Sequence, residues 1–250
     1  MIGEEEQRVD DKRNSLLTVG LICAVLLILG VADLCNSDRL YSDTENRVLA
    51  SRPVFSWENL FSGKYGDKYE EYITDQFVGR DKWICLKTRT DISFQKKEIN
   101  GVYLGADRYL IGVNDPENYT EQMENGRIAS LKKLVNRWDA KVMLVPTADN
   151  ILTQKLPDFA PYYQEERLLE KVREAVGDDH YVDVYHALQE HAEEPIYYRT
   201  DHHWTSLGAY YGFMAWAESV DRFPFPYNTA GMKTVSDDFQ GTLQSRINLD

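Results

Sequence analysis

The sequence predicts an α/β domain built on a parallel sheet, with an N-terminal transmembrane helix ahead of it. The first observation is the order of elements between residues 141 and 220, where three short apolar runs alternate with helical patterns. Strands that alternate with helices in this way form parallel sheets. The second observation is the apolar run at residues 16–34, which has about the length needed to span a bilayer, at the short end of the range.

The N-terminal segment favours a membrane anchor. Residues 1–15 are polar and end in Lys12 and Arg13, and positive charge on this side of an apolar run places it in the cytoplasm. A cleaved signal peptide, with Gly30-Val31-Ala32 as its cleavage site, is the rival interpretation, and a buried soluble helix is a third. We predict a cytoplasmic head at 1–15, a transmembrane anchor or signal sequence at 16–34, and a single-pass cell-membrane protein whose main domain is extracytoplasmic.

A polar connector is expected at residues 35–56, and the α/β domain at residues 57–250. The domain begins with helical patterns that meet at Asp75, Arg80 and Asp81. We interpret these three residues as an ion-pair cluster at a helix junction; a ligand site is the alternative. Residues 100–113 then alternate with glycines, which is typical of a hairpin or two short strands.

The elements of the predicted sheet follow in order. They are a helix at 120–138, a strand at 141–146, a helix at 164–176, a strand at 181–185, a short helix at 186–191, a strand at 196–199 and a helix from Thr205 to about residue 220. Asp149 and Asn150 follow the first of these strands, at the carboxyl end where open α/β sheets gather their ligands. They are substrate-binding candidates, and a helix N-cap is the alternative use.

The stretch Asp201-His202-His203-Trp204 lies between the last strand and the last helix of this series. An Asp two residues before a His can hold the imidazole in one tautomer, and that imidazole can then act as a general base. Asp201 and His203 are therefore the catalytic candidates, with His202 and Trp204 as substrate-binding candidates beside them. Trp204 could stack on a sugar ring, although packing against the next helix is favoured. The alternative for the whole stretch is a purely structural turn.

Together with other segments, this tetrapeptide resembles the signature of the DHHW family. The other segments are Glu45-Asn46-Arg47, the run from Asp75 to Asp81, residues 101–105 and the loop at residues 239–243. The DHHW family is similar in turn to the alginate O-acetyltransferase-type proteins, which carry a permuted SGNH-hydrolase fold with an Asp-x-His pair. The resemblance implies an SGNH-hydrolase-like three-layer α/β/α domain in which Asp201 orients His203 as the general base for a serine.

The resemblance also implies an activity. We expect an extracytoplasmic O-acyltransferase or esterase that acts on a cell-surface or exported polysaccharide, with a membrane acyltransferase as a candidate supplier of the acyl group. The family's serine lies downstream of the Asp-x-His pair, whereas Ser206 belongs to a first helical turn and Ser236 and Ser245 lack the sharp Gly-flanked turn that exposes a nucleophile. We therefore expect either a domain incomplete at its C-terminus or a non-catalytic, membrane-anchored carbohydrate-binding or scaffolding protein.

Charge and cysteine content exclude other functions. The net charge of −13 would repel nucleic acid, so no nucleic-acid partner is expected. Three cysteines give no disulfide framework and no plausible zinc set. Asp201, His202 and His203 could hold a divalent ion together with His186 or His191, but the side chains of adjacent histidines diverge. We expect no metal and no cofactor.

Overall fold

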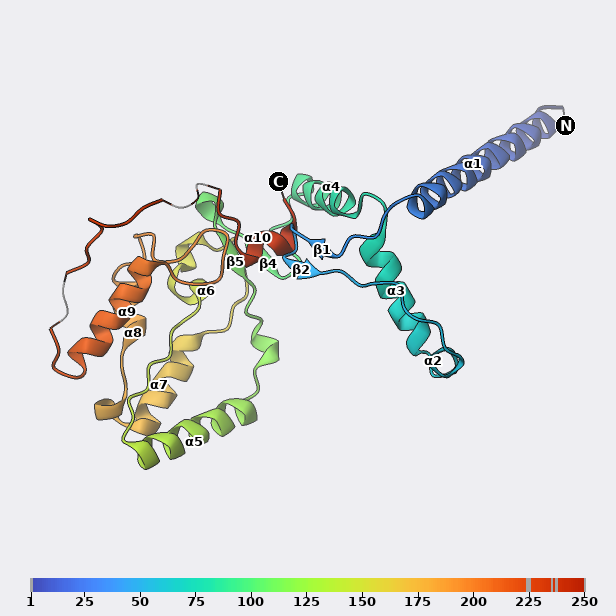
Figure 1. The fold of residues 1–250 in the computed structure, drawn as a ribbon. Coiled ribbons are helices and arrows are strands. Elements are labelled where there is room, and N and C mark those ends of the chain that lie inside the picture. Colours follow the sequence, from blue (N-terminus) through green and yellow to red (C-terminus); the bar gives the residue numbers. More distant parts are fainter. Residues whose placement is uncertain (1, 224–225, 235, 237, 250) are drawn as a thin grey trace. The chain divides into compact units, whose positions relative to one another are not determined.

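The computed structural model describes residues 2–223, 226–234, 236 and 238–249. Met1 and Asp250, the outer ends of the predicted cytoplasmic head and α/β domain, lie outside the described residues. The chain divides into two compact units, residues 1–84 and residues 85–250 (Figure 1).

The first unit begins with a long helix, α1 (Ile2–Leu34). Its part from Lys12 to Leu34 contains an 18-residue window with a mean hydropathy of 2.7 that is not buried by the described residues, so by length and composition it could cross a bilayer. The remaining elements of the unit are a two-stranded antiparallel hairpin and three helices: β1 (Tyr41–Ser42), β2 (Arg47–Val48), α2 (Trp57–Phe61), α3 (Lys64–Gln76) and the first turn of α4 (Arg80–Ser93).

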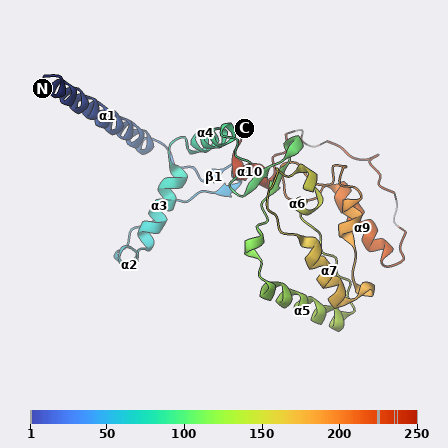
Figure 2. The same ribbon diagram turned by 180° about the vertical axis from the view of Figure 1, so that it is seen from behind.

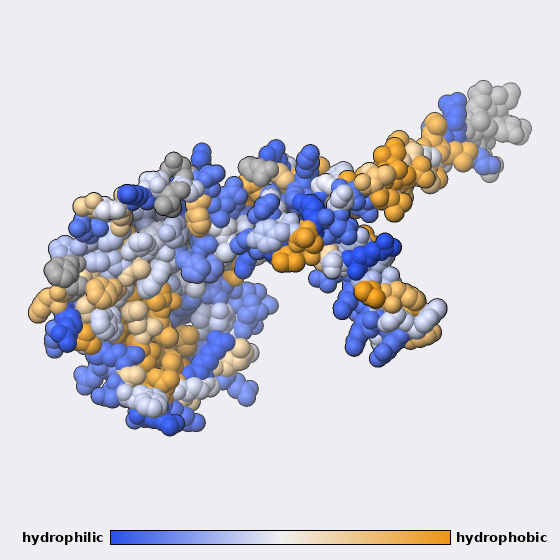
Figure 3. Space-filling model, viewed as in Figure 1, coloured by the Kyte–Doolittle hydropathy of each residue, from blue (hydrophilic) through white to orange (hydrophobic). Residues whose placement is uncertain are grey.

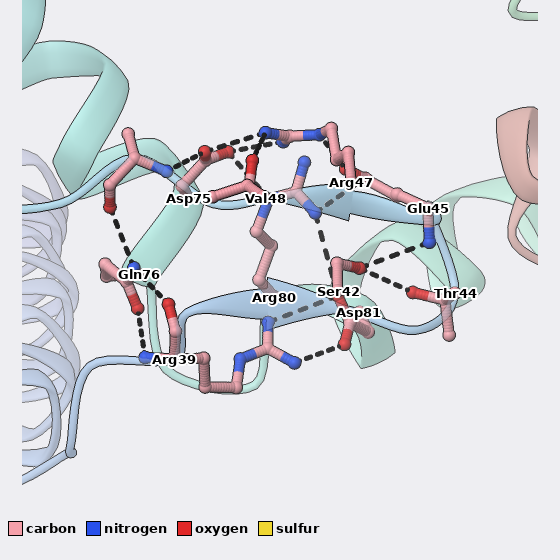
Figure 4. A network of polar contacts seen from close by, with 11 residues as sticks. Arg39, Ser42, Thr44, Glu45, Arg47, Val48, Asp75, Gln76, Arg80 and Asp81 are labelled. Atoms are coloured by element: carbon pink, nitrogen blue, oxygen red, sulfur yellow. Dashed lines mark hydrogen bonds and ion pairs between the residues drawn. The ribbon is translucent and has the colours of Figure 1, made fainter.

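A network of ion pairs joins the β1–β2 hairpin to α3 and the start of α4 (Figure 4). Arg47 donates to both carboxylate oxygens of Asp75, at 2.8 and 2.5 Å, and Arg80 donates to Glu45 at 2.6 Å. Arg80 also lies 3.6 Å from Asp81. Hydrogen bonds from Arg47 hold the pKa of Asp75 below its ordinary value, although burial acts in the opposite direction. The predicted ion-pair cluster at this helix junction is present; with Arg39, which donates to Asp81 at 2.6 Å, three arginines face three carboxylates.

A three-stranded antiparallel sheet opens the second unit. Its strands are β3 (Glu98–Ile99), β4 (Val102–Leu104) and β5 (Leu110–Gly112), paired in chain order. The β3–β4 turn consists of Asn100 and Gly101, whose φ angles are +50° and +73°. Two positive φ values in a two-residue loop are the type I′ geometry that matches the twist of a hairpin. The hairpin or two short strands predicted at residues 100–113 are present as β4 and β5, which pair antiparallel, whereas β3 lies ahead of the predicted range.

Apart from isolated bridges, the regular elements that follow this sheet among the described residues are helices. They are α5 (Glu121–Trp138), α6 (Ala148–Ile151), α7 (Glu165–Val176), α8 (Val184–Gln189), α9 (Ser206–Glu218) and α10 (Thr242–Ile247), with single 3₁₀ turns at Ala106–Arg108, Pro116–Asn118, Thr153–Lys155 and Asp178–His180. In both views α7 lies beside α5 (Figures 1 and 2), and α8 lies beside α9 (Figure 1).

Only a fragment of the predicted parallel sheet is formed within the described residues. Val142 and Tyr181 form one parallel bridge. In it, Val142 N–H donates to the backbone carbonyl of His180 at 2.7 Å, and Val182 N–H donates to the backbone carbonyl of Val142 at 2.9 Å. The third predicted strand, at 196–199, instead contributes an antiparallel bridge between Tyr197 and Trp204. The three-layer arrangement with a parallel sheet stays a prediction.

One predicted strand is shorter than expected. The segment 181–185 was expected to be extended, but α8 begins at Val184. The Asp183 carboxylate accepts a hydrogen bond from His186 N–H at 3.2 Å, which satisfies a backbone donor of the first helical turn. Asp183 thus starts the helix two residues earlier than the apolar pattern predicts.

The core of the second unit lies between these helices and the short bridges. Its most deeply buried side chains include Ile111, Leu152, Val172, Val184, Leu188 and Ile196, none more than 2 % exposed. A smaller cluster joins α10 to the antiparallel sheet through Leu243 and Ile247, which pack against Ile99, Val102 and Leu110. This second cluster fixes α10, and with it Thr242, beside the turn that carries Asp201.

Candidate functional site

The candidate site is the turn between Tyr197 and Trp204. Tyr198 N–H donates to the backbone carbonyl of His203 at 3.2 Å, and Thr205 N–H donates to the backbone carbonyl of Ile196 at 2.8 Å. These two hydrogen bonds close the turn. Thr205 then caps α9, because its hydroxyl accepts a hydrogen bond from Gly208 N–H at 3.3 Å. The predicted placement of this stretch directly ahead of a helix is confirmed.

Asp201 and His203 form the predicted pair. Asp201 Oδ1 lies 2.5 Å from His203 Nδ1 and accepts from His203 N–H at 2.9 Å. Asp201 is 6 % exposed, whereas the His203 side chain is 63 % exposed. Among the described residues this contact with Asp201 is the only hydrogen bond of the His203 ring. A carboxylate bonded to Nδ1 fixes the proton there and leaves Nε2 with its lone pair, which is the form a general base requires.

Asp201 is held as a carboxylate by donors from two segments. Its Oδ2 accepts from Thr242 N–H at 2.8 Å and from the Thr242 hydroxyl at 3.0 Å, in addition to the two bonds from His203. Burial acts to raise the pKa of Asp201, but these four hydrogen bonds outweigh it and bring the pKa far below its ordinary value. Asp201 therefore stays ionised over the whole physiological pH range and continues to accept the hydrogen bond from His203.

Thr242 is a site residue that the sequence interpretation missed. It lies 41 positions beyond Asp201 and also contacts His202, whose Nδ1 is 2.8 Å from the Thr242 hydroxyl. Gly241 makes this approach feasible, because a Cβ at that position would lie 2.4 Å from Asp201 Cβ and 2.5 Å from the Thr200 carbonyl oxygen. The resemblance of residues 239–243 to a family loop was the available signal.

His202 and Trp204, the two neighbouring candidates, have different surroundings. The rings of His202 and His203 lie 3.8 Å apart between centroids. Because the His202 side chain is exposed, it lines the outer side of the turn. Trp204 packs against α9 instead: a Cβ on Gly212 would lie 2.8 Å from its ring, and one on Gly208 would lie 3.1 Å from its own Cβ. The two glycines of α9 make room for the indole, and the packing that we favoured for Trp204 is what the structure shows.

Asp149 and Asn150 lie in a second polar cluster, at the start of α6. Both are buried, at 1 % and 4 % exposure. The Asn150 side-chain oxygen accepts from Glu165 N–H at 2.9 Å, at the first residue of α7. Glu165 in turn accepts from Thr147 N–H at 2.8 Å and from the Thr147 hydroxyl at 2.8 Å. The cluster ties the loop after the first predicted strand to the N-terminus of α7.

In this second cluster two carboxyl groups compete for one hydroxyl. The Thr147 hydroxyl contacts both Asp149 Oδ1 and Glu165 Oε1, yet a hydroxyl has only one hydrogen to donate. A proton on either carboxyl would supply the second hydrogen bond. Burial raises the pKa of Asp149 and of Glu165. Asp149 Oδ2 is buried without a hydrogen-bond partner in the described part of the chain, which a neutral carboxyl tolerates better than a carboxylate.

The two clusters are linked through Tyr197. Within the described residues, no hydrogen bond joins Asp149 or Asn150 directly to the 201–204 turn. Tyr197 is paired with Trp204 at the base of the turn, and its hydroxyl donates to the Pro146 carbonyl at 2.7 Å, next to the second cluster. Burial raises the pKa of Tyr197, as do the nearby carboxyls of Glu165 and Asp149.

The donor atoms of Asp201, His202 and His203 could also be considered as metal ligands, since they lie within 4.8 Å of one another. The hydrogen bonds argue for a different use. His203 Nδ1 is bonded to Asp201, His202 Nδ1 is bonded to Thr242, and each Asp201 oxygen already accepts hydrogen bonds. This geometry is that of an oriented base.

Comparison with known proteins agrees with the motif. Residues 115–249, more than half of the chain, match the family described as the SGNH hydrolase-like domain of the acetyltransferase AlgX. A DHHW family protein from Eubacterium siraeum DSM 15702, known from its crystal structure, has a sequence 25 % identical to this chain and a TM-score of 0.48 against it. The match covers 60 % of this chain and 52 % of that one, so the chain spans about half of that protein. No curated protein matches this sequence. The resemblance inferred from the motifs is confirmed, and the chain belongs to the AlgX family of SGNH hydrolase-like domains.

Proposed function

We propose that this protein is a membrane-tethered, extracytoplasmic O-acyltransferase or esterase that acts on a cell-surface or exported polysaccharide. The observation that carries the proposal is the Asp201–His203 pair, in a chain that belongs to an acetyltransferase-type SGNH family. A buried carboxylate bonded to Nδ1 and an exposed ring with an unengaged Nε2 are what an acyl-transfer base needs.

The proposed chemistry is a two-step acyl transfer. His203 Nε2 takes the proton of a serine hydroxyl while the serine oxygen attacks the carbonyl of an acyl ester, and the departing alcohol then receives that proton. In the second step a sugar hydroxyl, or water, gives its proton to Nε2 and attacks the acyl-serine; the bond between the acyl carbon and the serine oxygen then breaks, and that oxygen takes the proton back from Nε2. Asp201 stabilises the imidazolium that forms in each step.

The proposal does not assign the nucleophile to Ser206, Ser236 or Ser245. Ser206 lies in the first turn of α9, Ser245 contacts the Gly241 carbonyl at 3.5 Å, and Ser236 is bonded to Asp238 at 2.7 Å. None of the three is bonded to His203 in the described part of the chain. This observation also supports the alternative function, a non-catalytic membrane-anchored protein that binds carbohydrate or acts as a scaffold.

The surroundings of the pair complete the proposal. His202, Trp204, Asp149 and Asn150 remain substrate-binding candidates, with His202 as the exposed member of the group. For the domain at residues 57–250 we keep the SGNH-like three-layer α/β/α arrangement, in which the Val142–Tyr181 bridge is the beginning of the parallel sheet.

The membrane placement is part of the same proposal. Residues 1–15 form a cytoplasmic head, residues 16–34 the anchor, and residues 35–56 a connector on the far side of the membrane. This topology would present the site to an exported polymer and to a membrane acyltransferase that supplies the acyl group. The apolar stretch from Lys12 to Leu34 supports it.

Turnover of an acetyl ester by the protein as isolated from its own membranes tests the proposal. We expect hydrolysis of 4-nitrophenyl acetate, and its loss in His203→Ala with the circular dichroism spectrum unchanged. Binding of soluble polysaccharide without turnover in the wild type would support the non-catalytic alternative.

A further inference from the structure

An uncovered strip of aromatic side chains lies on α2 and α3 in the first unit. We call it the aromatic strip, and it consists of Phe55, Trp57, Phe61, Tyr65, Tyr69 and Tyr72. Phe61 is 83 % exposed and Trp57 is 66 % exposed. α2 buries no residue, and α3 buries only Asp75 and Gln76. An apolar surface of this size that nothing in the described structure covers marks an interaction site.

The strip is continuous, because each ring contacts the next. Phe55 packs edge-on against Trp57 and Tyr65, with centroids 5.2 and 5.4 Å apart. Trp57 stacks on Phe61, and Tyr65 stacks on Tyr69; Tyr72 follows Tyr69 at 6.0 Å. The space-filling view shows apolar side chains along α1 and again at the tip around α2 (Figure 3).

One end of the strip is bonded to the chain that leaves α1. Val78 N–H, just beyond α3, donates to Asp33 in the last turn of α1 at 3.2 Å. The Tyr72 hydroxyl donates to Asp38, four residues after the end of α1, at 2.9 Å. The helix that could span the bilayer and the aromatic strip are therefore joined at the point where the span ends.

From this juxtaposition we propose that the aromatic strip lies in the headgroup region of the same bilayer that α1 spans. The proposal rests on the membrane anchoring proposed above. Tyrosine and tryptophan favour this interface because their rings are apolar and their polar tips stay hydrated. At about 100° per residue, Tyr65, Tyr69 and Tyr72 share one face of α3, whereas Asp67 and Glu70 lie on the opposite face. The division into an aromatic and a charged face is a feature of interfacial helices; the charged face of α3 is acidic, so the aromatic side chains rather than attraction to anionic lipid would hold it at the membrane.

The composition of the strip favours a lipid surface over a glycan. A sugar needs an open ring face with polar partners for its hydroxyls, and here the rings stack on one another. The neighbours at the tip are aliphatic: Val54 is 86 % exposed and Leu60 is 41 % exposed. Apolar side chains of this kind gain by entering the acyl boundary.

Quenching of tryptophan fluorescence by brominated lipid tests the proposal. The full chain would be reconstituted into phosphatidylcholine vesicles with and without dibromo-acyl phosphatidylcholine, as wild type, Trp57→Phe and Trp138→Phe. Trp138 is the matched control, because it is 68 % exposed but belongs to α5 of the second unit. The brominated lipid quenches a certain amount of the wild-type emission. We expect this amount to be smaller in Trp57→Phe, by about one fifth of the total emission because the chain has five tryptophans. We expect it to be unchanged in Trp138→Phe.

Three results would overturn the proposal in distinguishable ways. If the chain resists an alkaline carbonate wash but Trp57 is reached by aqueous iodide and not by the brominated lipid, the strip is not interfacial and the anchor stands. If the wash releases the chain, the membrane anchor fails together with this inference. If a soluble polysaccharide shifts the Trp57 emission while brominated lipid does not quench it, the strip is a glycan surface.

Discussion

Replacing Asp201 with asparagine should destabilise the protein by about 1.5–3 kcal/mol at pH 7. The Asp201 carboxylate accepts four hydrogen bonds, two on each oxygen. In Asp201→Asn one oxygen becomes an amide that itself donates. If the oxygen stays with His203, the amide faces Thr242 N–H and the Thr242 hydroxyl. The hydroxyl can rotate, but the N–H loses its acceptor. Each bond to a charged, buried acceptor contributes about 1.5–3 kcal/mol, which gives the expected loss.

Urea unfolding in detergent, followed by circular dichroism, would measure this loss. Asp183→Asn is the matched control, since Asp183 also accepts from a histidine Nδ1, at 2.8 Å, and from a backbone N–H. The Asp183 side chain is 36 % exposed, against 8 % for Asp201, and asparagine caps a helix as well as aspartate does. The control should therefore lose less than about 1 kcal/mol. Equal losses in the two variants would refute the assigned role of the Asp201 hydrogen bonds.

Three further predictions follow from the same geometry. Gly241→Ala should lower the melting temperature strongly, because the new Cβ would lie 2.4 Å from Asp201 Cβ. Gly231→Ala is the control: a Cβ there would have no atom within 4 Å, so the melting temperature should stay unchanged. Equal melting temperatures of the two variants would contradict the close approach of Gly241 to Asp201. Burial raises the pKa of Glu165 in the folded state, so its contribution to stability is full below about pH 4.3 and is lost as pH rises through the raised value. Glu165→Gln should flatten this decline in a pH series of urea unfolding, and an unchanged slope would contradict the raised pKa of Glu165. Cys35 is exposed just beyond the span, so a membrane-impermeant maleimide added to intact cells should label it, and labelling only after lysis would reverse the proposed topology.

The central pair of the site was predictable from sequence because its geometry is local. Asp201 and His203 are two residues apart in a turn, a spacing at which the carboxylate reaches both the ring and the backbone N–H of the histidine. The helix after them was equally clear, since Thr205 is a typical N-cap residue ahead of an apolar helical pattern. Local hydrogen bonds and caps are encoded within a few positions.

The remainder of the site depends on contacts that sequence spacing does not encode. Thr242 reaches Asp201 only because α10 packs against β4 and β5 through Leu243 and Ile247. The contacts of Asp149 and Glu165 with the Thr147 hydroxyl likewise join two segments. The start of α8 was misjudged for a local reason, because apolar residues at 181–185 fit a strand and a helix equally and the cap at Asp183 decides between them.

The most direct test of the central claim compares two adjacent histidines in one assay. Acetyl-ester turnover would be measured for the protein isolated from its own membranes, as wild type, His203→Ala and His202→Ala. His203 is bonded to the buried Asp201, whereas His202 is bonded to the Thr242 hydroxyl. We predict that His203→Ala lowers kcat by roughly 10²–10⁴-fold, the range for loss of a general base, and that His202→Ala stays within about tenfold of the wild type. Turnover unaffected by His203→Ala would contradict the assignment of His203 as the base.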